Sequence, residues 1–259
     1  MNFEVAGKRV FAYTAAHELD PAKPSVVFVH GAGLDHSLFG LQSRYFGYHG
    51  RNVLALDLPG HGRSEGPPLS TIEQMADWLS AVLKKTNSAK ASIVGHSMGS
   101  LAALELAARH PEQVERIAFC AIAFPMRVSD PFLEAARAND YSAFDMSTIW
   151  GHAPQVPLGG NPNPGMWMYG DTQARLERLA PGVLHADLKA CNDYQFAGDV
   201  KCPALFILGR RDVMTPPRAA KGLQDKIPGA RTVVVDFSGH SLMAEAPDAT
   251  LDALIEFLR

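Results

Sequence analysis

The segment Gly95-His96-Ser97-Met98-Gly99 matches the pattern G-x-S-x-G, in which a serine stands between two glycines. A short apolar run at residues 92–94 precedes it, and an Ala- and Leu-rich stretch at residues 98–109 follows it. This context predicts a sharp turn between a strand and a helix, which exposes the serine hydroxyl while the glycines avoid clashes between neighbouring segments. We therefore predict that Ser97 is a nucleophile.

A serine hydroxyl is a weak nucleophile at neutral pH and needs a base. Of the ten histidines, His240 is the best placed, because it follows the apolar run at residues 232–235 and precedes the helical pattern at residues 249–258. In a parallel sheet this position lies at the same edge as Ser97. We predict that His240 is the general base.

A histidine base needs a carboxylate that fixes its tautomer and orientation. Asp212 directly follows the apolar run at residues 204–208, so we expect it at the same edge of the sheet and predict that it orients His240. Asp236 also follows a strand pattern and is a weaker candidate. Asp57 ends a strand before the serine, and we expect it to stabilise the loop at residues 58–64 instead.

Acyl transfer also needs hydrogen-bond donors for the developing oxyanion. One is expected to be the backbone N–H of Met98, the residue after the nucleophile. The loop that follows the apolar run at residues 26–29 should supply the other, from Ala32 or alternatively from Gly33. We expect His30 to brace this loop by hydrogen bonding.

The elements that must position these residues are short apolar runs separated by helical patterns. The runs lie at residues 26–29, 53–56, 92–94, 116–119, 204–208 and 232–235. Helical patterns at residues 71–85, 98–109, 218–227 and 249–258 lie between or after them. Continuous apolar strands indicate burial on both faces, which is typical of a parallel sheet between helices. With an antiparallel edge formed near residues 3–5 and 10–15, the prediction is a doubly wound α/β fold with a mostly parallel, eight-stranded sheet.

The strand pattern is absent from residues 124–196, which contain two of the three tryptophans and a Pro- and Gly-rich tract. A structureless loop of this length is improbable. We predict a mainly helical cap at residues 124–196 over a core domain formed by residues 1–123 and 197–259. The expected substrate-binding residues are Trp150, Met166, Trp167 and Phe124. Four cap arginines, Arg127, Arg137, Arg175 and Arg178, are expected to be solvated, with the alternative that one binds a substrate carboxylate.

The composition is that of a soluble globular protein, with 47% hydrophobic and 20% charged residues and a net charge of -3. This charge does not favour a nucleic acid or an anionic membrane as partner. We expect a small-molecule substrate and a cytoplasmic location, because the sequence has neither a signal-peptide pattern nor ~18 consecutive apolar residues. Three cysteines without metal-binding spacing predict no disulfide framework, no metal and no cofactor. The sequence does not indicate an oligomeric state.

Together these motifs resemble the α/β-hydrolase superfamily. His30-Gly31, the loop at residues 57–64, the Ser97 turn, the segment at residues 209–216 and Gly239-His240 occur in the family's order, over about residues 25–123 and 200–259. The resemblance implies a Ser-His-Asp triad and a cap inserted after the sixth strand.

The resemblance also bears on the reaction. Family members that open epoxides or carbon–halogen bonds carry an aspartate in place of Ser97. The resemblance therefore implies hydrolysis of carboxylic esters, lactones or thioesters, with apolar substrates favoured by the aromatic and methionine-rich cap. Hydrolysis of carbon–carbon or amide bonds, and a ligand-sensing receptor that retains the triad, remain alternatives.

Overall fold

The computed structural model describes residues 1–88, 90–160 and 167–259. In this part of the chain, eight strands form one sheet in the order β1-β2-β4-β3-β5-β6-β7-β8. Their bounds are Asn2–Val5 (β1), Lys8–Tyr13 (β2), Ser25–Val29 (β3), Asn52–Leu56 (β4), Ala91–His96 (β5), Val114–Cys120 (β6), Ala204–Gly209 (β7) and Arg231–Val235 (β8). β2 is antiparallel to β1 and β4, and the strands from β4 through β3 to β8 are parallel. The predicted mostly parallel sheet with an antiparallel edge is confirmed.

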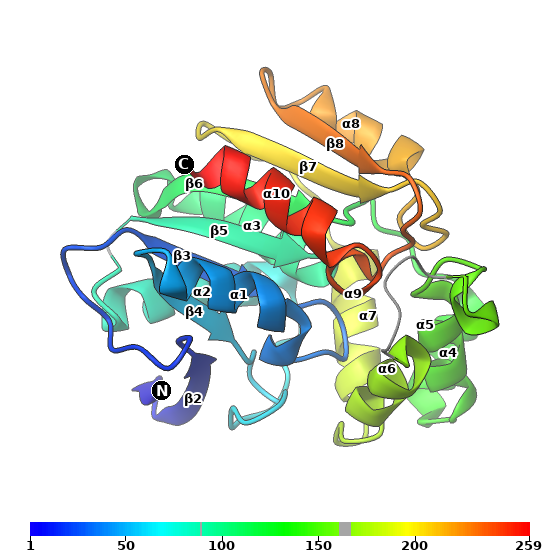
Figure 1. Ribbon diagram of the computed structural model, residues 1–259. Coiled ribbons are helices and arrows are strands. Elements are labelled where there is room, and N and C mark those ends of the chain that lie inside the picture. Colours follow the sequence, from blue (N-terminus) through cyan, green and yellow to red (C-terminus); the bar gives the residue numbers. More distant parts are fainter. Residues whose placement is uncertain (89, 161–166) are drawn as a thin grey trace.

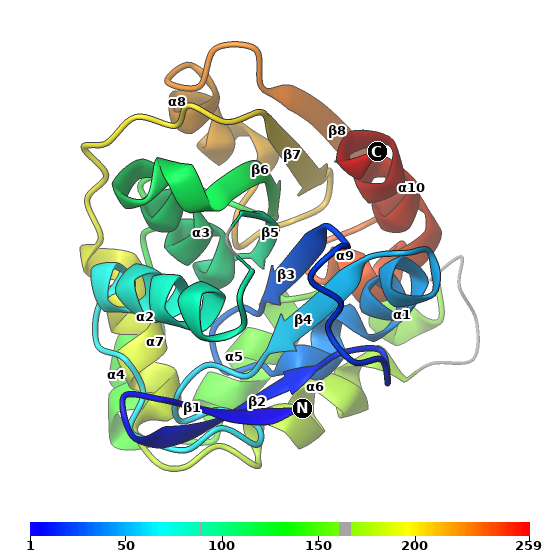
Figure 2. The same ribbon diagram turned by 90° about the vertical axis from the view of Figure 1, so that its left-hand side faces the viewer.

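Helices cover both faces of the sheet, so the apolar strands at its centre are buried on both sides, whereas β8 at the edge is mostly exposed. α2 (Ile72–Lys85) and α3 (Met98–Arg109) lie on one face, and α1 (Gly40–Tyr48) and α10 (Pro247–Leu258) lie on the other (Figure 2). Shorter elements complete the core: α8 (Lys221–Gln224), α9 (Leu242–Glu245) and the 3-10 turns His36–Phe39, Pro111–Gln113 and Pro217–Ala220. The helix predicted at residues 218–227 is therefore shorter than expected and begins as a 3-10 turn.

The strands at the centre of the sheet carry the buried core. Every residue of β3, β4 and β5 is buried, because helices pack on both sides of these strands. Ser97 directly follows β5, so the nucleophile predicted from the sequence stands at the end of a fully buried strand.

The described residues between β6 and β7 form four helices: α4 (Asp130–Ala138), α5 (Ser142–Trp150), α6 (Met168–Leu176) and α7 (Val183–Asp193). Between α5 and α6 lies the 3-10 turn Val156–Leu158. α4, α5 and α6 gather at the right of Figure 1, on the side toward which the arrow of β7 points. They share a small apolar cluster with α7, built around Phe132, Leu176 and Leu184. These helices form the region predicted as a cap, and its boundaries at residues 124 and 196 stay a prediction.

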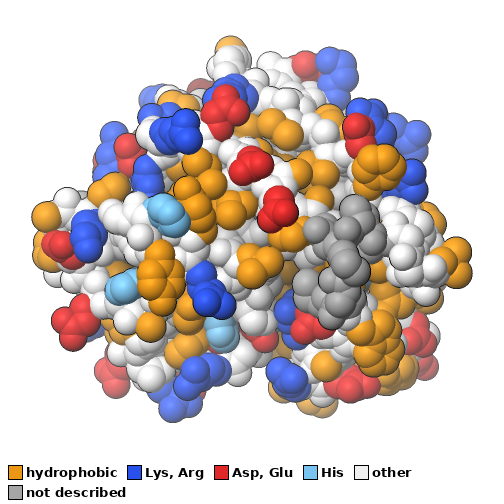
Figure 3. Space-filling view, viewed as in Figure 1, with side chains coloured by type: hydrophobic (Ala, Val, Ile, Leu, Met, Phe, Trp, Pro, Cys, Tyr) orange, Lys and Arg blue, Asp and Glu red, His pale blue; other side chains and the backbone are white. Residues whose placement is uncertain are grey.

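The face drawn in Figure 3 shows no single dominant charge. On this face, lysine and arginine side chains alternate with acidic and apolar ones. Within the described ranges, no helix combines the length and apolar character needed to cross a membrane.

Because α3 lies so close to β3, we expect the stability of the protein to be sensitive to any side chain at Gly99. A Cβ atom there would lie 2.2 Å from the carbonyl oxygen of Val29 and 2.5 Å from that of His30. Both contacts are with backbone, which cannot rotate away. We expect Gly99→Ala to lower the free energy of unfolding by about 1–3 kcal/mol, as overpacking does.

Urea denaturation followed by circular dichroism measures this loss. Gly40→Ala is the matched control, because Gly40 has helical backbone angles and a Cβ atom there would meet nothing within 4 Å. A Gly99→Ala variant as stable as Gly40→Ala would contradict the packing argument.

Candidate active site

Ser97 occupies a strained turn between β5 and α3. Its φ of 51° and ψ of -115° are rarely adopted by a residue with a side chain. The turn can be this tight because Gly95 has no Cβ atom. A Cβ atom there would lie 2.3 Å from the carbonyl oxygen of Gly99 and would clash with it. Hydrogen bonds hold the strained geometry: Ser97 N donates to the Cys120 carbonyl at 2.9 Å, and Ser100 Oγ donates to that of Gly95 at 2.8 Å.

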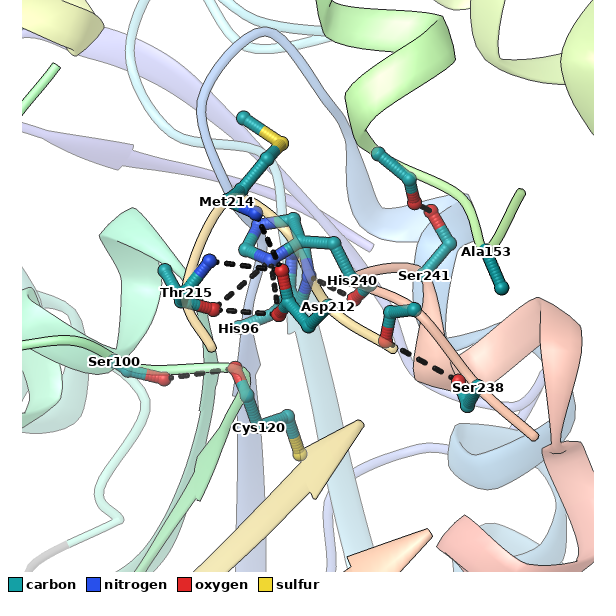
Figure 4. A network of polar contacts seen from close by, with 12 residues as sticks. His96, Ser100, Cys120, Ala153, Asp212, Met214, Thr215, Ser238, His240 and Ser241 are labelled. Atoms are coloured by element: carbon teal, nitrogen blue, oxygen red, sulfur yellow. Dashed lines mark hydrogen bonds and ion pairs between the residues drawn. The ribbon is translucent and has the colours of Figure 1, made fainter. Parts of the chain in front are cut away.

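Asp212 and His240 are in direct contact. His240 Nδ1 lies 2.8 Å from Asp212 Oδ2, which also accepts a hydrogen bond from the Thr215 hydroxyl at 2.6 Å. The backbone N–H groups of Met214 and Thr215 donate to Asp212 Oδ1 at 2.8 Å each (Figure 4). Hydrogen bonds from the turn after β7 thus fix the position of the Asp212 carboxylate. The carboxylate in turn accepts a hydrogen bond from His240 Nδ1 and so keeps the proton on this nitrogen.

The environment of Asp212 keeps this carboxylate ionised. Burial alone would raise its pKa, but the neighbouring His240 and hydrogen bonds from His240 and Thr215 outweigh burial and lower the pKa below its ordinary value. The arrangement suits an acid that orients an imidazole and stabilises the imidazolium.

Ser97 and His240 lie on the wall of one cavity of about 360 Å³. About half of the residues that enclose it are aliphatic, aromatic or methionine residues, and they come from both the core and the cap: Ala32, Leu34, Leu38, Met126, Val128, Phe132, Trp150, Met168, Leu184, Leu188, Val213, Met214 and Ala244. This cavity is the place where a substrate carbonyl could meet the serine.

The two competing carboxylates serve other purposes. Asp236 is exposed and pairs with Arg210. Asp57 accepts hydrogen bonds from His36 N at 2.7 Å and Arg63 N at 2.8 Å, so it shapes the loop that follows it, as predicted.

His30 braces the loop after β3, as predicted. Its Nδ1 donates to the Gly31 carbonyl at 2.8 Å, and its Nε2 accepts from Leu58 N at 3.1 Å. Burial, followed by the charge of His61, lowers the pKa of His30 to about 4, so the ring is neutral.

One cluster in the described residues has spacing suited to a metal ion: Asp35, His36 and Asp57. Its acceptor atoms are already engaged. Asp35 Oδ1 accepts from Ser37 N at 2.8 Å, and Asp57 Oδ1 lies 2.8 Å from His36 Nδ1. Hydrogen bonding explains the cluster, and we assign no metal to it.

The two candidate loop donors for the oxyanion differ in availability. Gly33 N donates to Asp187 Oδ2 at 2.8 Å, so this N–H is already occupied. Ala32 lies on the cavity wall. Met98 is the first residue of α3, and its N–H has no acceptor within the helix. Of the two predicted loop donors, Gly33 is therefore the one already engaged, and the assignment of Ala32 and Met98 as oxyanion donors stays a prediction.

The predicted pocket residues are only partly found on the cavity wall. Trp150 lines the cavity. Trp167 is 78% exposed, lies at the start of α6 and is not among the residues that line the cavity. Its predicted place in the substrate pocket is therefore wrong. Phe124 packs its ring against Tyr194 and Phe196 and is also not a lining residue. Met166 lies outside the described residues.

The expectation that the cap arginines are solvated is wrong for Arg175. Its side chain is only 14% exposed, lies on the cavity wall and pairs with Asp171 at 2.6 Å. Arg127 also borders the cavity, whereas Arg137 is exposed and pairs with Glu134. The periodicity of the cap could not tell which face of α6 is directed toward the site.

Sequence reasoning also missed Glu245, which is 1% exposed. Its Oε2 accepts from Ala153 N at 2.9 Å and Gly239 N at 3.0 Å, and its Oε1 accepts from Ser241 N at 3.1 Å. Burial raises the pKa of Glu245, against the effect of these three donors. The carboxylate thus holds both residues that flank His240 and joins them to the cap. The only signal was an acidic residue within an apolar stretch.

His96 supports the same segment from β5. Its Nε2 donates to the carbonyl oxygen of His240 at 3.0 Å, and the two rings lie 4.7 Å apart. Burial, followed by the charge of His240, lowers the pKa of His96 to about 3. The neutral ring therefore acts as a hydrogen-bond donor to the backbone that carries the predicted base.

A parallel sheet whose central strand ends in a strained serine turn defines the class of α/β hydrolases. The model of the alpha/beta hydrolase family matches residues 26–253. The chain belongs to this family.

Its relatives include a pimeloyl-(acyl-carrier protein) methyl ester esterase of Chromobacterium violaceum, which is 29% identical over 91% of this chain and 94% of the relative. An (E)-2-((N-methylformamido)methylene)succinate hydrolase of Acinetobacter baylyi is 21% identical over 98% of this chain and 96% of its own. Among solved structures, the enol-lactonase from Burkholderia xenovorans LB400 superposes with a TM-score of 0.84 at 25% identity, over 100% of this chain and 99% of the lactonase. A thermophilic esterase gives the same TM-score and identity over 100% and 96% of the two chains.

The contacts of Asp212 predict the effect of neutralising it. Asp212→Asn should reduce kcat by up to ~10⁴-fold on an ester substrate, because an amide leaves the wrong histidine tautomer in place. Steady-state kinetics with a p-nitrophenyl ester measure this loss.

Asp236→Asn is the matched control, since Asp236 is exposed and paired with Arg210. Its rate should stay within about twofold of the unmodified protein, as for most surface changes that touch no site. Equal losses in the two variants would move the acid away from Asp212.

Proposed function

We propose that this protein is a serine hydrolase that cleaves carboxylic esters, including lactones and thioesters, of small to medium apolar substrates. One observation carries the proposal. The serine on the strained turn shares a cavity wall with a histidine whose Nδ1 lies 2.8 Å from a buried carboxylate.

In the proposed reaction, Ser97 Oγ attacks the substrate carbonyl while His240 Nε2 takes the hydroxyl proton. Asp212 accepts from His240 Nδ1 and stabilises the imidazolium. The backbone N–H groups of Met98 and Ala32 stabilise the oxyanion. The protonated histidine then gives its proton to the leaving alcohol, and water activated by His240 hydrolyses the acyl-enzyme.

The lining of the cavity supports an uncharged, apolar substrate. Aliphatic, aromatic and methionine side chains form about half of its lining, and they favour burial of an apolar acyl or aryl group. Arg127, Asp171 and Arg175 are charged lining residues, and Asp171 pairs with Arg175 at 2.6 Å. The relatives named as a methyl ester esterase and an enol-lactonase fit ester chemistry on a small molecule.

We also propose a cytoplasmic location. Cys120, Cys191 and Cys202 are free thiols in the structure, and free thiols persist in a reducing compartment.

The test of the nucleophile is Ser97→Ala. This variant should lose turnover of p-nitrophenyl butyrate and labelling by a fluorophosphonate, because both need the activated hydroxyl. Ser147→Ala is the control, since Ser147 also lies on the cavity wall but not on the turn. Labelling that persists in Ser97→Ala would assign the chemistry to another residue.

The apolar pocket is tested with pairs of esters of matched size, one member of each pair carrying a terminal carboxylate. We expect the uncharged member to have the higher kcat/KM by at least ~10-fold, because Asp171 already compensates Arg175 and the side chain of Arg127 is exposed to solvent. If the anionic members are better by that factor, Arg175 or Arg127 binds the substrate carboxylate and the apolar pocket is misassigned.

A further inference from the structure

Asp187 links the cap to the loop that carries the proposed oxyanion donor. It comes from α7 and is fully buried. Its Oδ2 accepts a hydrogen bond from Gly33 N at 2.8 Å and lies 2.8 Å from His61 Nε2. Gly33 and Asp187 are 154 positions apart in the chain. A cap carboxylate thus holds both the loop after β3 and the loop after β4.

The hydrogen bonds of His61 define its charge. Nδ1 lies 3.0 Å from the carbonyl oxygen of Pro59, and Nε2 faces the Asp187 carboxylate. Both partners are acceptors, and a neutral imidazole has only one N–H. With Asp187 ionised, His61 satisfies both contacts only as an imidazolium, so it forms a buried ion pair with Asp187.

The surroundings of His61 agree with this charge. Burial alone would lower its pKa, but the Asp187 carboxylate and the hydrogen bonds to Asp187 and Pro59 raise the pKa above its ordinary value. Asp57 raises it further. The His30 ring, 4.9 Å away, is neutral because its Nε2 accepts from Leu58 N.

Hydrogen bonds fix the orientation of two successive peptide groups in the loop after β3. The Gly31 carbonyl accepts from His30 Nδ1 at 2.8 Å and from Leu34 N at 3.2 Å. In a trans peptide the N–H points away from the carbonyl, so these contacts direct Ala32 N–H to the opposite side. The next peptide N–H, that of Gly33, is held by Asp187.

The cap also packs directly on this peptide. Gly33 has a φ of 68°, and a Cβ atom there would lie 2.8 Å from Leu176 Cδ2 in α6 and 3.1 Å from Leu184 Cδ1 in α7. The cap therefore contacts the loop through both apolar packing and a charged hydrogen bond.

We propose that Asp187 and His61 are positioning residues, which fix the Gly33 peptide and thereby aim the Ala32 N–H at the oxyanion. Neither residue lines the cavity, so both act through the loop rather than on substrate. The inference rests on the proposed hydrolase function. The proposal assigns a role to His61, a residue of the motif at residues 57–64 that takes no part in the catalytic triad.

The first test is Asp187→Asn against Asp193→Asn. Both residues lie on α7, but Asp193 is half-exposed and pairs with its helix neighbours Lys189 and Asn192. We expect Asp187→Asn to lower kcat by about 10- to 100-fold with little change in KM, since a misaimed oxyanion donor costs less than a deleted one. A rise in KM at unchanged kcat would overturn the proposal, because it indicates a change of pocket shape only.

A second readout does not need turnover. Reaction of Ser97 with a p-nitrophenyl alkylphosphonate releases one nitrophenolate per serine and passes through a transition state that uses the same donors. Its rate should fall in Asp187→Asn by about the factor seen in kcat, and stay unchanged in Asp193→Asn. If the unmodified protein reacts with the phosphonate but hydrolyses no ester, the proposed function fails while this comparison still decides the positioning. Equal phosphonylation rates in the two variants overturn the positioning.

Two further measurements test the proposal if the Asp187→Asn variant does not fold. The ¹⁵N spectrum of the unmodified protein at pH 7.5 should show both ring nitrogens of His61 protonated, and a single protonated nitrogen overturns the ion pair. His61→Gln keeps one donor toward Asp187 but loses the charge and the Pro59 contact. Its phosphonylation should be slower than that of the unmodified protein, and an unchanged rate in the folded variant contradicts the proposal.

Discussion

The close approach of α3 to β3 is the constraint on which the site depends. Gly99 lies against the carbonyl oxygens of Val29 and His30, with no room for a Cβ atom. This contact brings the first turn of α3 beside the loop that begins at His30, so the two proposed oxyanion donors belong to segments already in contact. Ser97, which directly precedes α3, has the strained backbone angles typical of such a turn. Packing of backbone against backbone, together with the hydrogen bonds of Ser97 N and Ser100 Oγ, thus sets the geometry from which the chemistry follows.

The sequence was most informative where function depends on local backbone pattern. Ser97, Asp212 and His240 each follow a short apolar run, and strand ends share one edge of a parallel sheet. Their order and neighbours were therefore enough to predict the contact between Asp212 and His240, and the fold class with it. The loop roles of Asp57 and His30 were predictable for the same reason, since their partners lie close to the ends of adjacent strands.

Residues that depend on how the cap lies over the core could not be predicted in this way. Trp167 and Trp150 are both aromatic cap residues, but only Trp150 lies on the cavity wall. Arg175 borders the cavity because one face of α6 turns inward, which its composition does not indicate. The contact of Gly33 with Asp187 joins distant segments, and no local pattern marks either partner. Such contacts are decided by three-dimensional packing alone.

The three hydrogen bonds to Glu245 have a consequence for how this architecture could diversify. One carboxylate binds a backbone N–H of the cap segment and two of the segment that carries His240. Ser241 adds two more bonds, from its N and its hydroxyl to the carbonyl oxygen of Gly151. A cap transplanted from a relative would therefore have to reproduce the backbone path at residues 151–153, and not only the pocket side chains. Exchange of the cap between relatives should therefore succeed when residues 151–153 are kept together with the segment that carries His240. It should fail when a junction falls within residues 151–153.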